Sequence, residues 1–139
     1  MTAKEYLSEI QKYRRLAESL AERAEELRVQ AEGVKAITYD KDRVQTSVTN
    51  RTEEIIAKLA DVQEEYVQAI ADYHRAADQR EQQIAQLPNQ SEVRVLILRY
   101  CHGKDWNDVA NELGYTWRHT LRIHGDALQS FADKYKDVI

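Results

Sequence analysis

Two arginines near the end of the sequence have the spacing of side chains that bind nucleic acid. Arg118 and Arg122 are four residues apart, so in a helix both lie on one face. A guanidinium group pairs with a guanine edge in the DNA major groove or with phosphate. Trp117 and Leu121 lie beside them, and one or the other is expected to pack on a thymine methyl group. The alternative is that both arginines are solvated surface charges, but Trp117 next to Arg118 favours DNA contact.

Two short helical patterns between residues 105 and 131 are expected to hold these side chains. Gly114 follows the last apolar position of the first pattern, where a left-handed backbone conformation is needed. Ala110 is the small residue at which the second helix crosses the first. The positions expected to be buried are Val109, Leu113, Tyr115, Thr120 and Ile123. This arrangement is typical of a helix-turn-helix, whose recognition helix, here about 117–131, lies in the major groove of double-stranded DNA.

Burial of those positions predicts which side chains face DNA. The predicted contact residues are Thr116, Trp117, Arg118, His119, Leu121 and Arg122 in the last helix, with Lys104 and Arg99 before it. Lys104, His119 and Arg99 are expected to contact phosphates, which orient a protein on DNA without specifying its sequence.

Metal binding and catalysis find little support in the residue pattern. His119 and His124 are five residues apart, which places them on different sides of a helix, and Cys101 has no cysteine partner. The four glycines form no phosphate-binding loop, and no nucleophile motif is present. We therefore expect no metal, no cofactor and no enzyme activity.

The composition predicts an all-α protein. The 139 residues are 32% charged and include four glycines and one proline, a mixture that favours long helices. No apolar run approaches the roughly 20 residues that span a bilayer, so we expect no membrane partner. The first ten residues lack the apolar region of a signal peptide, and a single cysteine suits a reducing compartment. A cytoplasmic location is therefore expected.

The charge is unevenly distributed. Residues 1–88 carry 13 Lys and Arg against 17 Asp and Glu, whereas residues 89–139 carry seven of each. The predicted DNA-binding part is therefore neutral, and its non-specific affinity for phosphate is expected to be modest and salt-sensitive.

Residues 2–34 show a heptad repeat. Thr2 and Glu5 form a capping box, and apolar residues then recur in alternating steps of four and three. They are Tyr6, Ile10, Tyr13, Ala17, Leu20, Ala24, Leu27, Ala31 and Val34. A polar connection is expected over residues 38–49.

A second amphipathic helix is predicted from a capping box at Asn50 and Glu53 to the residue before Pro88. Two helices of similar length suit an antiparallel hairpin, although an intermolecular coiled coil would use the same seam. We expect a hairpin that also self-associates, giving a homo-oligomer through the N-terminal helices.

Residues 89–139 are predicted to form a separate tri-helical domain after a coiled-coil region at 1–88. Asn89 and Glu92 form a third capping box, and the following helix is apolar on nearly every side, as in a domain core. Gly103 ends that helix, while Asp105 and Thr116 are expected to cap the next two.

The run LILRYCHGKDWNDVANELGYTWRHTLRIHGDAL, residues 96–128, resembles region 4 of bacterial sigma factors. It is more similar still to phage and prophage regulators of the RinA and ArpU type. The matching residues are Leu98, Arg99, Tyr100, Trp106, Ala110, Leu113, Gly114, Tyr115, His124, Gly125, Ala127 and Leu128. The segment Tyr39–Ser47 also resembles a connector between that family's N-terminal helices. The resemblance implies a phage or prophage transcriptional regulator that binds specific DNA sequences.

Two residues depart from the family pattern: Thr120 stands where an apolar residue is usual, and Asp126 stands where a basic one is common. The loss of a basic residue and the neutral charge leave two alternatives open. One is an interaction protein whose sigma-like domain binds RNA polymerase or a regulator. The other is a DNA-packaging accessory of the small-terminase kind.

Overall fold

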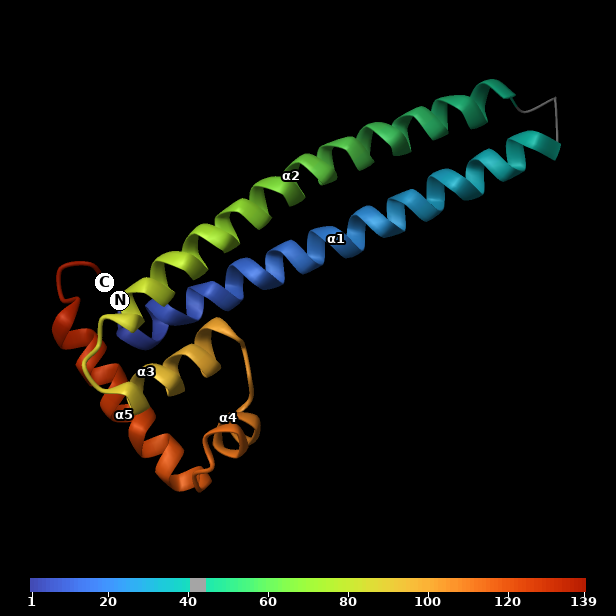
Figure 1. Ribbon diagram of the computed structural model, residues 1–139. Coiled ribbons are helices and arrows are strands. Elements are labelled where there is room, and N and C mark those ends of the chain that lie inside the picture. The colour runs from blue at the N-terminus through green and yellow to red at the C-terminus, as the bar shows by residue number, and fades with distance from the viewer. Residues whose placement is uncertain (41–44) are drawn as a thin grey trace. The chain divides into compact units, whose positions relative to one another are not determined.

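The structure is a computed structural model that describes the backbone of residues 1–40 and 45–139 and the side chains of residues 1–34 and 50–139. Its described residues form helices and loops without a strand, which confirms the predicted all-α class (Figure 1). The elements are α1 (Ala3–Asp40), α2 (Gln45–Ala85), α3 (Gln90–Leu96), a π-helical turn (Ile97–Cys101), α4 (Trp106–Leu113) and α5 (Trp117–Lys134). None of the described helices is long and apolar enough to cross a membrane.

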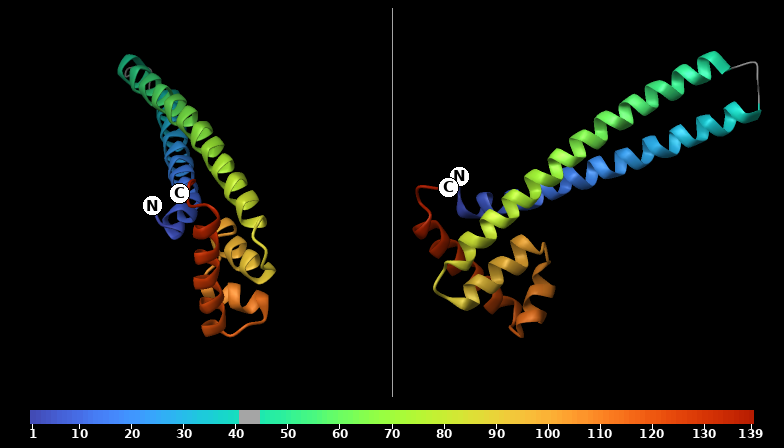
Figure 2. Two further views of the ribbon diagram at one scale, coloured as in Figure 1. Left: turned by 90° about the vertical axis from the view of Figure 1, so that its left-hand side faces the viewer. Right: turned by 45° about the horizontal axis from the view of Figure 1, so that its top comes forward.

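The long N-terminal hairpin is confirmed. Helices α1 and α2 lie side by side and run in opposite directions in all views (Figures 1 and 2). In the compact unit Arg14–Asp72, the heptad positions of both helices form a common core. Its buried members are Leu27, Ala31, Ile55 and Val62, and Leu20, Ala24, Val34 and Leu59 pack against them.

Both hairpin helices extend beyond their predicted ends at the connection, whereas α2 ends at Ala85, before its predicted end at residue 87. Helix α1 continues through Gly33 to Asp40, and Asn50 lies inside α2, so the predicted capping box of Asn50 with Glu53 is wrong. The predicted connection over 38–49 is correspondingly too long. Each residue added to an existing helix gains a hydrogen bond, which offsets the poor helix propensity of Gly or Asn. The side chains of the family-like segment Tyr39–Ser47 lie outside the described residues.

The second compact unit combines Met1–Tyr13 with Tyr73–Ile139. The start of α1 and the end of α2 therefore group with residues 89–139 by their contacts, while the division into regions 1–88 and 89–139 stays a prediction. The shared core consists of Ala3, Tyr6, Leu7, Ile10, Ile84, Leu87, Leu96, Tyr100, Ala127 and Phe131. The Phe131 ring lies 5.9 Å from that of Tyr6 and so joins the end of α5 to the start of α1.

Arg80 is a buried charge at the centre of this second unit. Its residue is 6% exposed, and its guanidinium forms an ion pair with Glu9. The Nε atom donates to the Tyr6 carbonyl at 3.3 Å, and the guanidinium carbon lies 4.0 Å from the Tyr6 ring centroid. Pairing and hydrogen bonding compensate the cost of removing this charge from water.

The end of α5 is tied to the end of α2 by polar contacts as well. The Tyr135 hydroxyl donates to the Gln83 carbonyl at 2.7 Å, and Lys134 Nζ donates to the Gln86 carbonyl at 2.9 Å. The Gln83 carbonyl also accepts from the Gln86 N–H at 3.3 Å, so the Tyr135 bond is its second, while the Lys134 bond gives the Gln86 carbonyl a partner just past the end of α2.

Four predicted helix caps are present. Thr2 and Glu5 exchange hydrogen bonds between backbone and side chain, as a capping box requires. The side chains of Asn89, Asp105 and Thr116 each accept a hydrogen bond from backbone N–H groups of the helix that follows. The start of each helix in the C-terminal segment is therefore fixed locally.

Candidate nucleic-acid interface

The turn between α4 and α5 has the predicted geometry. Gly114 adopts φ 71° and ψ 28°, in the left-handed region, and ends α4. The Tyr115 N–H donates to the Ala110 carbonyl at 3.0 Å, so the chain reverses without leaving this carbonyl unpaired. The two helices thus meet as a helix-turn-helix motif requires.

The crossing of α4 and α5 is closely packed. Val109 and Thr120 are fully buried, and Ala110 is 5% exposed. The Thr120 hydroxyl donates to the Thr116 carbonyl at 2.9 Å, which satisfies a polar group in this apolar place. Threonine therefore fits where the family resemblance predicts an apolar residue. Leu113, Tyr115 and Ile123, also predicted to be buried, are only partly buried.

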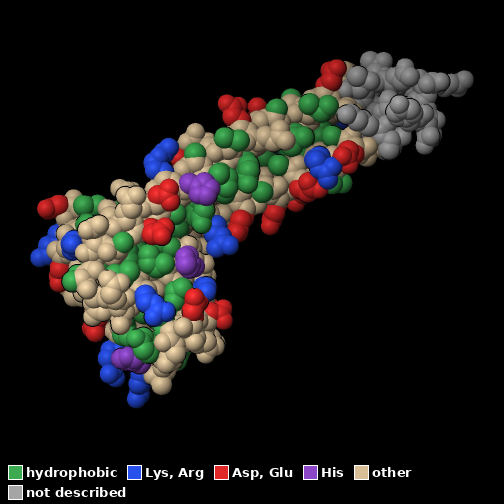
Figure 3. Space-filling view, viewed as in Figure 1, with side chains coloured by type: hydrophobic (Ala, Val, Ile, Leu, Met, Phe, Trp, Pro, Cys, Tyr) green, Lys and Arg blue, Asp and Glu red, His purple; other side chains and the backbone are tan. Residues whose placement is uncertain are grey.

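The first half of α5 presents an exposed basic face. Thr116, Trp117, Arg118, His119 and Arg122 are exposed, with Trp117 at 55%, whereas Leu121 is partly buried. The segment 117–125 contains two arginines and no carboxylate. In Figure 3, blue Lys and Arg side chains gather at the lower end of the molecule, where α5 begins.

Neither arginine is used to hold the fold together. Arg118 and Arg122 form no hydrogen bond or ion pair with any residue that the structure describes. Their guanidinium groups therefore keep all their donors for a ligand or for water.

Arg99 and Lys104, predicted to contact phosphate, both have partners within the protein. Arg99 Nη1 donates to the Lys104 carbonyl at 2.9 Å, and its guanidinium carbon lies 4.7 Å from the Trp106 ring centroid. Lys104 forms an ion pair with Glu112, which lowers the pKa of that carboxyl. Both side chains brace the loop before α4, and a phosphate contact by either would compete with these interactions.

His119 contacts the residue that leads into α5. Its ring centroid lies 4.9 Å from that of Tyr115 in an edge-on arrangement. The Tyr115 hydroxyl in turn lies 3.5 Å from the Ser91 hydroxyl in α3. The first turn of α5 is thereby braced against the start of α3.

His124 is a packing residue inside the tri-helical part. Its Nε2 atom lies 2.8 Å from the Tyr100 hydroxyl, and its ring meets Trp106 edge-on at 4.5 Å. Burial, together with the positive charges of Lys4 and Arg99, lowers its pKa to about 4. The imidazole is therefore neutral at physiological pH.

The described residues contain no cluster of three or more His, Cys, Asp or Glu side chains placed to hold a metal ion. Burial, reinforced by the nearby Glu81, raises the pKa of the Cys101 thiol to about 11. This thiol is therefore protonated and a poor nucleophile or metal ligand at neutral pH.

The internal roles of Arg99 and Arg80 could not be predicted from the sequence. Arg99 stacks on Trp106 across a turn, and Arg80 pairs with Glu9, which lies 71 positions earlier in the chain. The available signal was weak: Arg80 occupies a position of the α2 heptad seam, where a charged residue is unexpected. Comparison of the chain with protein-family models, curated proteins and solved structures gives no match.

Proposed function

We propose that the protein binds specific sequences of double-stranded DNA through the first half of α5 and regulates transcription. The observation that carries this proposal is the pair Arg118 and Arg122. Both are exposed, one turn apart, without a partner among the described residues, on the second helix of a helix-turn-helix. From the family resemblance of residues 96–128 we further infer that the regulator is of the phage or prophage type.

The spacing of the arginines suits base reading. At about 1.5 Å of rise per residue, Arg118 and Arg122 are about 6 Å apart along the axis of α5. This matches roughly two base-pair steps of B-DNA, given about 3.4 Å per step. With α5 along the major groove, each guanidinium would pair with a guanine, while Trp117 packs on a neighbouring thymine methyl group. His119 at the edge of the face would contact a phosphate.

The neutral charge of residues 89–139 predicts that a single recognition helix binds weakly. Two such helices in one oligomer would read two half-sites and raise the affinity through a high effective concentration. Self-association of the chain is therefore part of the proposed mechanism.

The test begins with selection of duplexes from a randomised pool by the full chain. Affinity for the selected site is then measured for the wild type, for Arg118→Ala/Arg122→Ala, and for Lys58→Ala/Lys136→Ala. The control pair also removes two exposed positive charges, both from residues outside α5. Each lost guanine contact costs about 1–3 kcal/mol, so the arginine pair should lose on the order of 100-fold or more in affinity. An unenriched pool, or equal losses in both double variants, would refute the proposal.

The neutral charge also favours a second candidate function, binding of a protein such as RNA polymerase. Exposed Trp117 beside Arg118 suits a protein interface, since Trp and Arg are enriched at the anchoring points of such surfaces. The dependence of binding on salt concentration distinguishes the two functions. DNA affinity should fall steeply with salt concentration, whereas co-purification with polymerase should survive moderate salt and be lost in Trp117→Ala.

A further inference from the structure

Helix α2 carries a second heptad seam beside the one that packs on α1. The first seam runs through Ile55, Leu59, Val62, Tyr66, Ala69, Tyr73 and Ala76, all buried or partly buried. The second is displaced by one residue and follows the same alternating steps: Ile56, Ala60, Gln63, Val67, Ile70, His74 and Ala77. We call these seven residues the outer seam.

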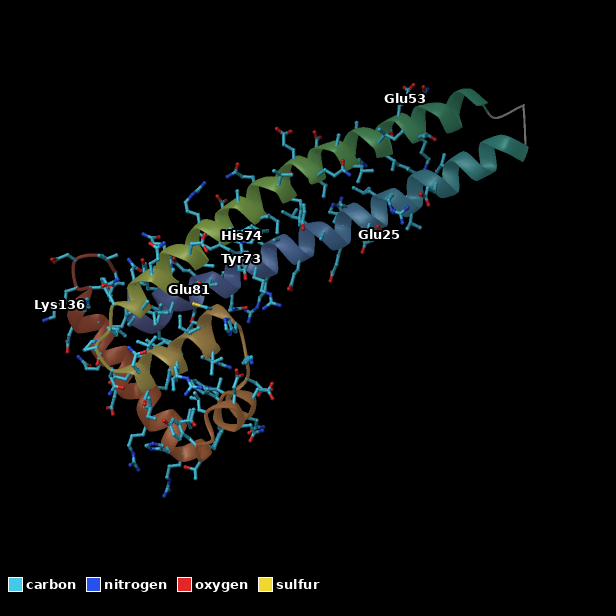
Figure 4. All side chains as sticks on the ribbon, in the orientation of Figure 1. Glu25, Glu53, Tyr73, His74, Glu81 and Lys136 are labelled. Carbon is cyan, nitrogen blue, oxygen red and sulfur yellow. The ribbon has the colours of Figure 1, made fainter. Side chains whose placement is uncertain are left out.

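Five of the seven outer-seam residues are apolar, the exceptions being Gln63 and His74, and most of the seam is exposed. Ile56 is 45% exposed and Val67 is 66% exposed, and Ala60 is also exposed. Figure 3 shows hydrophobic side chains along the hairpin face that is turned to the viewer. Tyr73 of the first seam and His74 of the outer seam, labelled in Figure 4, have ring centroids 5.3 Å apart. The exposed strip is therefore continuous with the seam that already packs on α1.

The hairpin by itself buries little apolar surface, and the outer seam adds nothing to its internal core. In the unit Arg14–Asp72, the buried apolar residues among those described are Ala17, Leu27, Ala31, Ile55, Val62 and Ala69. Three of these six are alanines, whose burial contributes little. A two-helix unit of this length gains most of its stability from packing on further surface, as helices in bundles do.

We propose that the outer seam of α2 is the interface with a second copy of this chain, against whose own outer seam it packs. Two adjacent heptad seams on one helix are typical of a bundle of more than two helices. The surface that packs against the outer seam is therefore itself a helix. A second copy presents the same apolar strip, as a two-fold interface requires. Val67 lies next to the middle of the outer seam. When the outer seams of the two copies overlap over their full length, the two Val67 side chains therefore come together.

Among the α1 side chains that the structure describes, up to residue 34, the large exposed apolar ones do not form a competing strip. Leu16 and Val29 are 53% and 54% exposed, but thirteen residues separate them, which places them on different sides of the helix. They therefore serve as matched controls, since they share the exposure of the outer-seam residues but not their alignment.

The first experiment measures the mass of the full chain by sedimentation in the absence of DNA. The wild type should sediment as a dimer of the 16.2 kDa chain. Val67→Glu should weaken dimerisation on the order of 100-fold or more, because it places two carboxylates in an apolar interface. Leu16→Glu and Val29→Glu should remain dimers. Circular dichroism checks that all three variants stay helical.

The second experiment locates the contact. In a Cys101→Ser background, Val67→Cys should be joined to a second copy by a short bismaleimide, while Val29→Cys should not. A monomeric wild type, equal dissociation in all three glutamate variants, or equal cross-linking at both cysteines would overturn the proposal. Because neither readout involves DNA, its failure is distinguishable from failure of the proposed DNA binding.

Discussion

The Tyr100 hydroxyl and His124 Nε2 lie 2.8 Å apart inside the tri-helical part, with the two rings stacked at 5.7 Å. Burial raises the pKa of Tyr100 and lowers that of His124. The tyrosine therefore remains a hydrogen-bond donor, and the neutral imidazole can accept from it.

Acid should weaken the fold through His124. Its pKa is about 4 in the folded protein and 6.5 when unperturbed, so between these values the unfolded chain binds more protons. Stability is therefore complete above pH 6.5 and falls as the pH drops towards 4. With allowance for partial exposure, the loss is about 1–2 kcal/mol. Urea unfolding at pH 7.5 and 4.5 measures it, and His124→Gln should show a smaller difference between the two pH values than the wild type.

Replacing Gly114 should destabilise the protein, whereas replacing Gly125 inside α5 should not. Gly114→Ala is expected to destabilise by about 1 kcal/mol, because a side chain is strained at φ 71°. A Cβ atom at Gly125 would meet nothing within 4 Å, so Gly125→Ala should stabilise by about 0.5–1 kcal/mol through helix propensity. Thermal unfolding of the two variants should show shifts of opposite sign; shifts of the same sign would contradict this account.

The buried hydroxyl of Thr120 should be dispensable. Its partner, the Thr116 carbonyl, also accepts from the Thr120 N–H at 3.0 Å, so Thr120→Val leaves no group unpaired. We expect Thr120→Val to change stability by less than about 1 kcal/mol, whereas Thr120→Asp should unfold the crossing because it buries a charge. Denaturant titration of both variants tests this. A large loss of unfolding free energy in the valine variant would show that the hydroxyl contributes to stability.

Removal of the Arg80 side chain should loosen the unit that joins the hairpin base to α5. Arg80→Ala loses the contacts with Glu9 and Tyr6 and leaves a cavity, so it should destabilise by about 2–4 kcal/mol. Arg75, an exposed arginine of α2 that belongs to neither seam, provides the control. Arg75→Ala should stay within about 1 kcal/mol of the wild type in the same unfolding assay.

Local features of this fold were predictable, and long-range ones were not. The caps at Thr2, Asn89, Asp105 and Thr116 depend on hydrogen bonds within one helical turn, which the sequence displays directly. The turn at Gly114 is equally local. The pairing of Tyr6 with Phe131 joins residues 125 positions apart, and no periodicity carries that information.

The candidate site was predictable in part. The exposure of Trp117, Arg118 and Arg122 followed from the burial pattern of their neighbours. The engagement of Arg99 with Trp106 did not, because it depends on how the loop at Gly103, with φ 67°, folds back towards α4. A positive charge looks the same in sequence whether it faces solvent or an indole ring.

Helix α5 separates two tasks along its length. Its second half holds Ala127 and Phe131 in the core, whereas Trp117, Arg118 and Arg122 in the first half contribute nothing to it. Mutations at those three positions can therefore accumulate without endangering folding. A lineage of such proteins could thus vary the proposed DNA contacts rapidly while every member kept the same architecture.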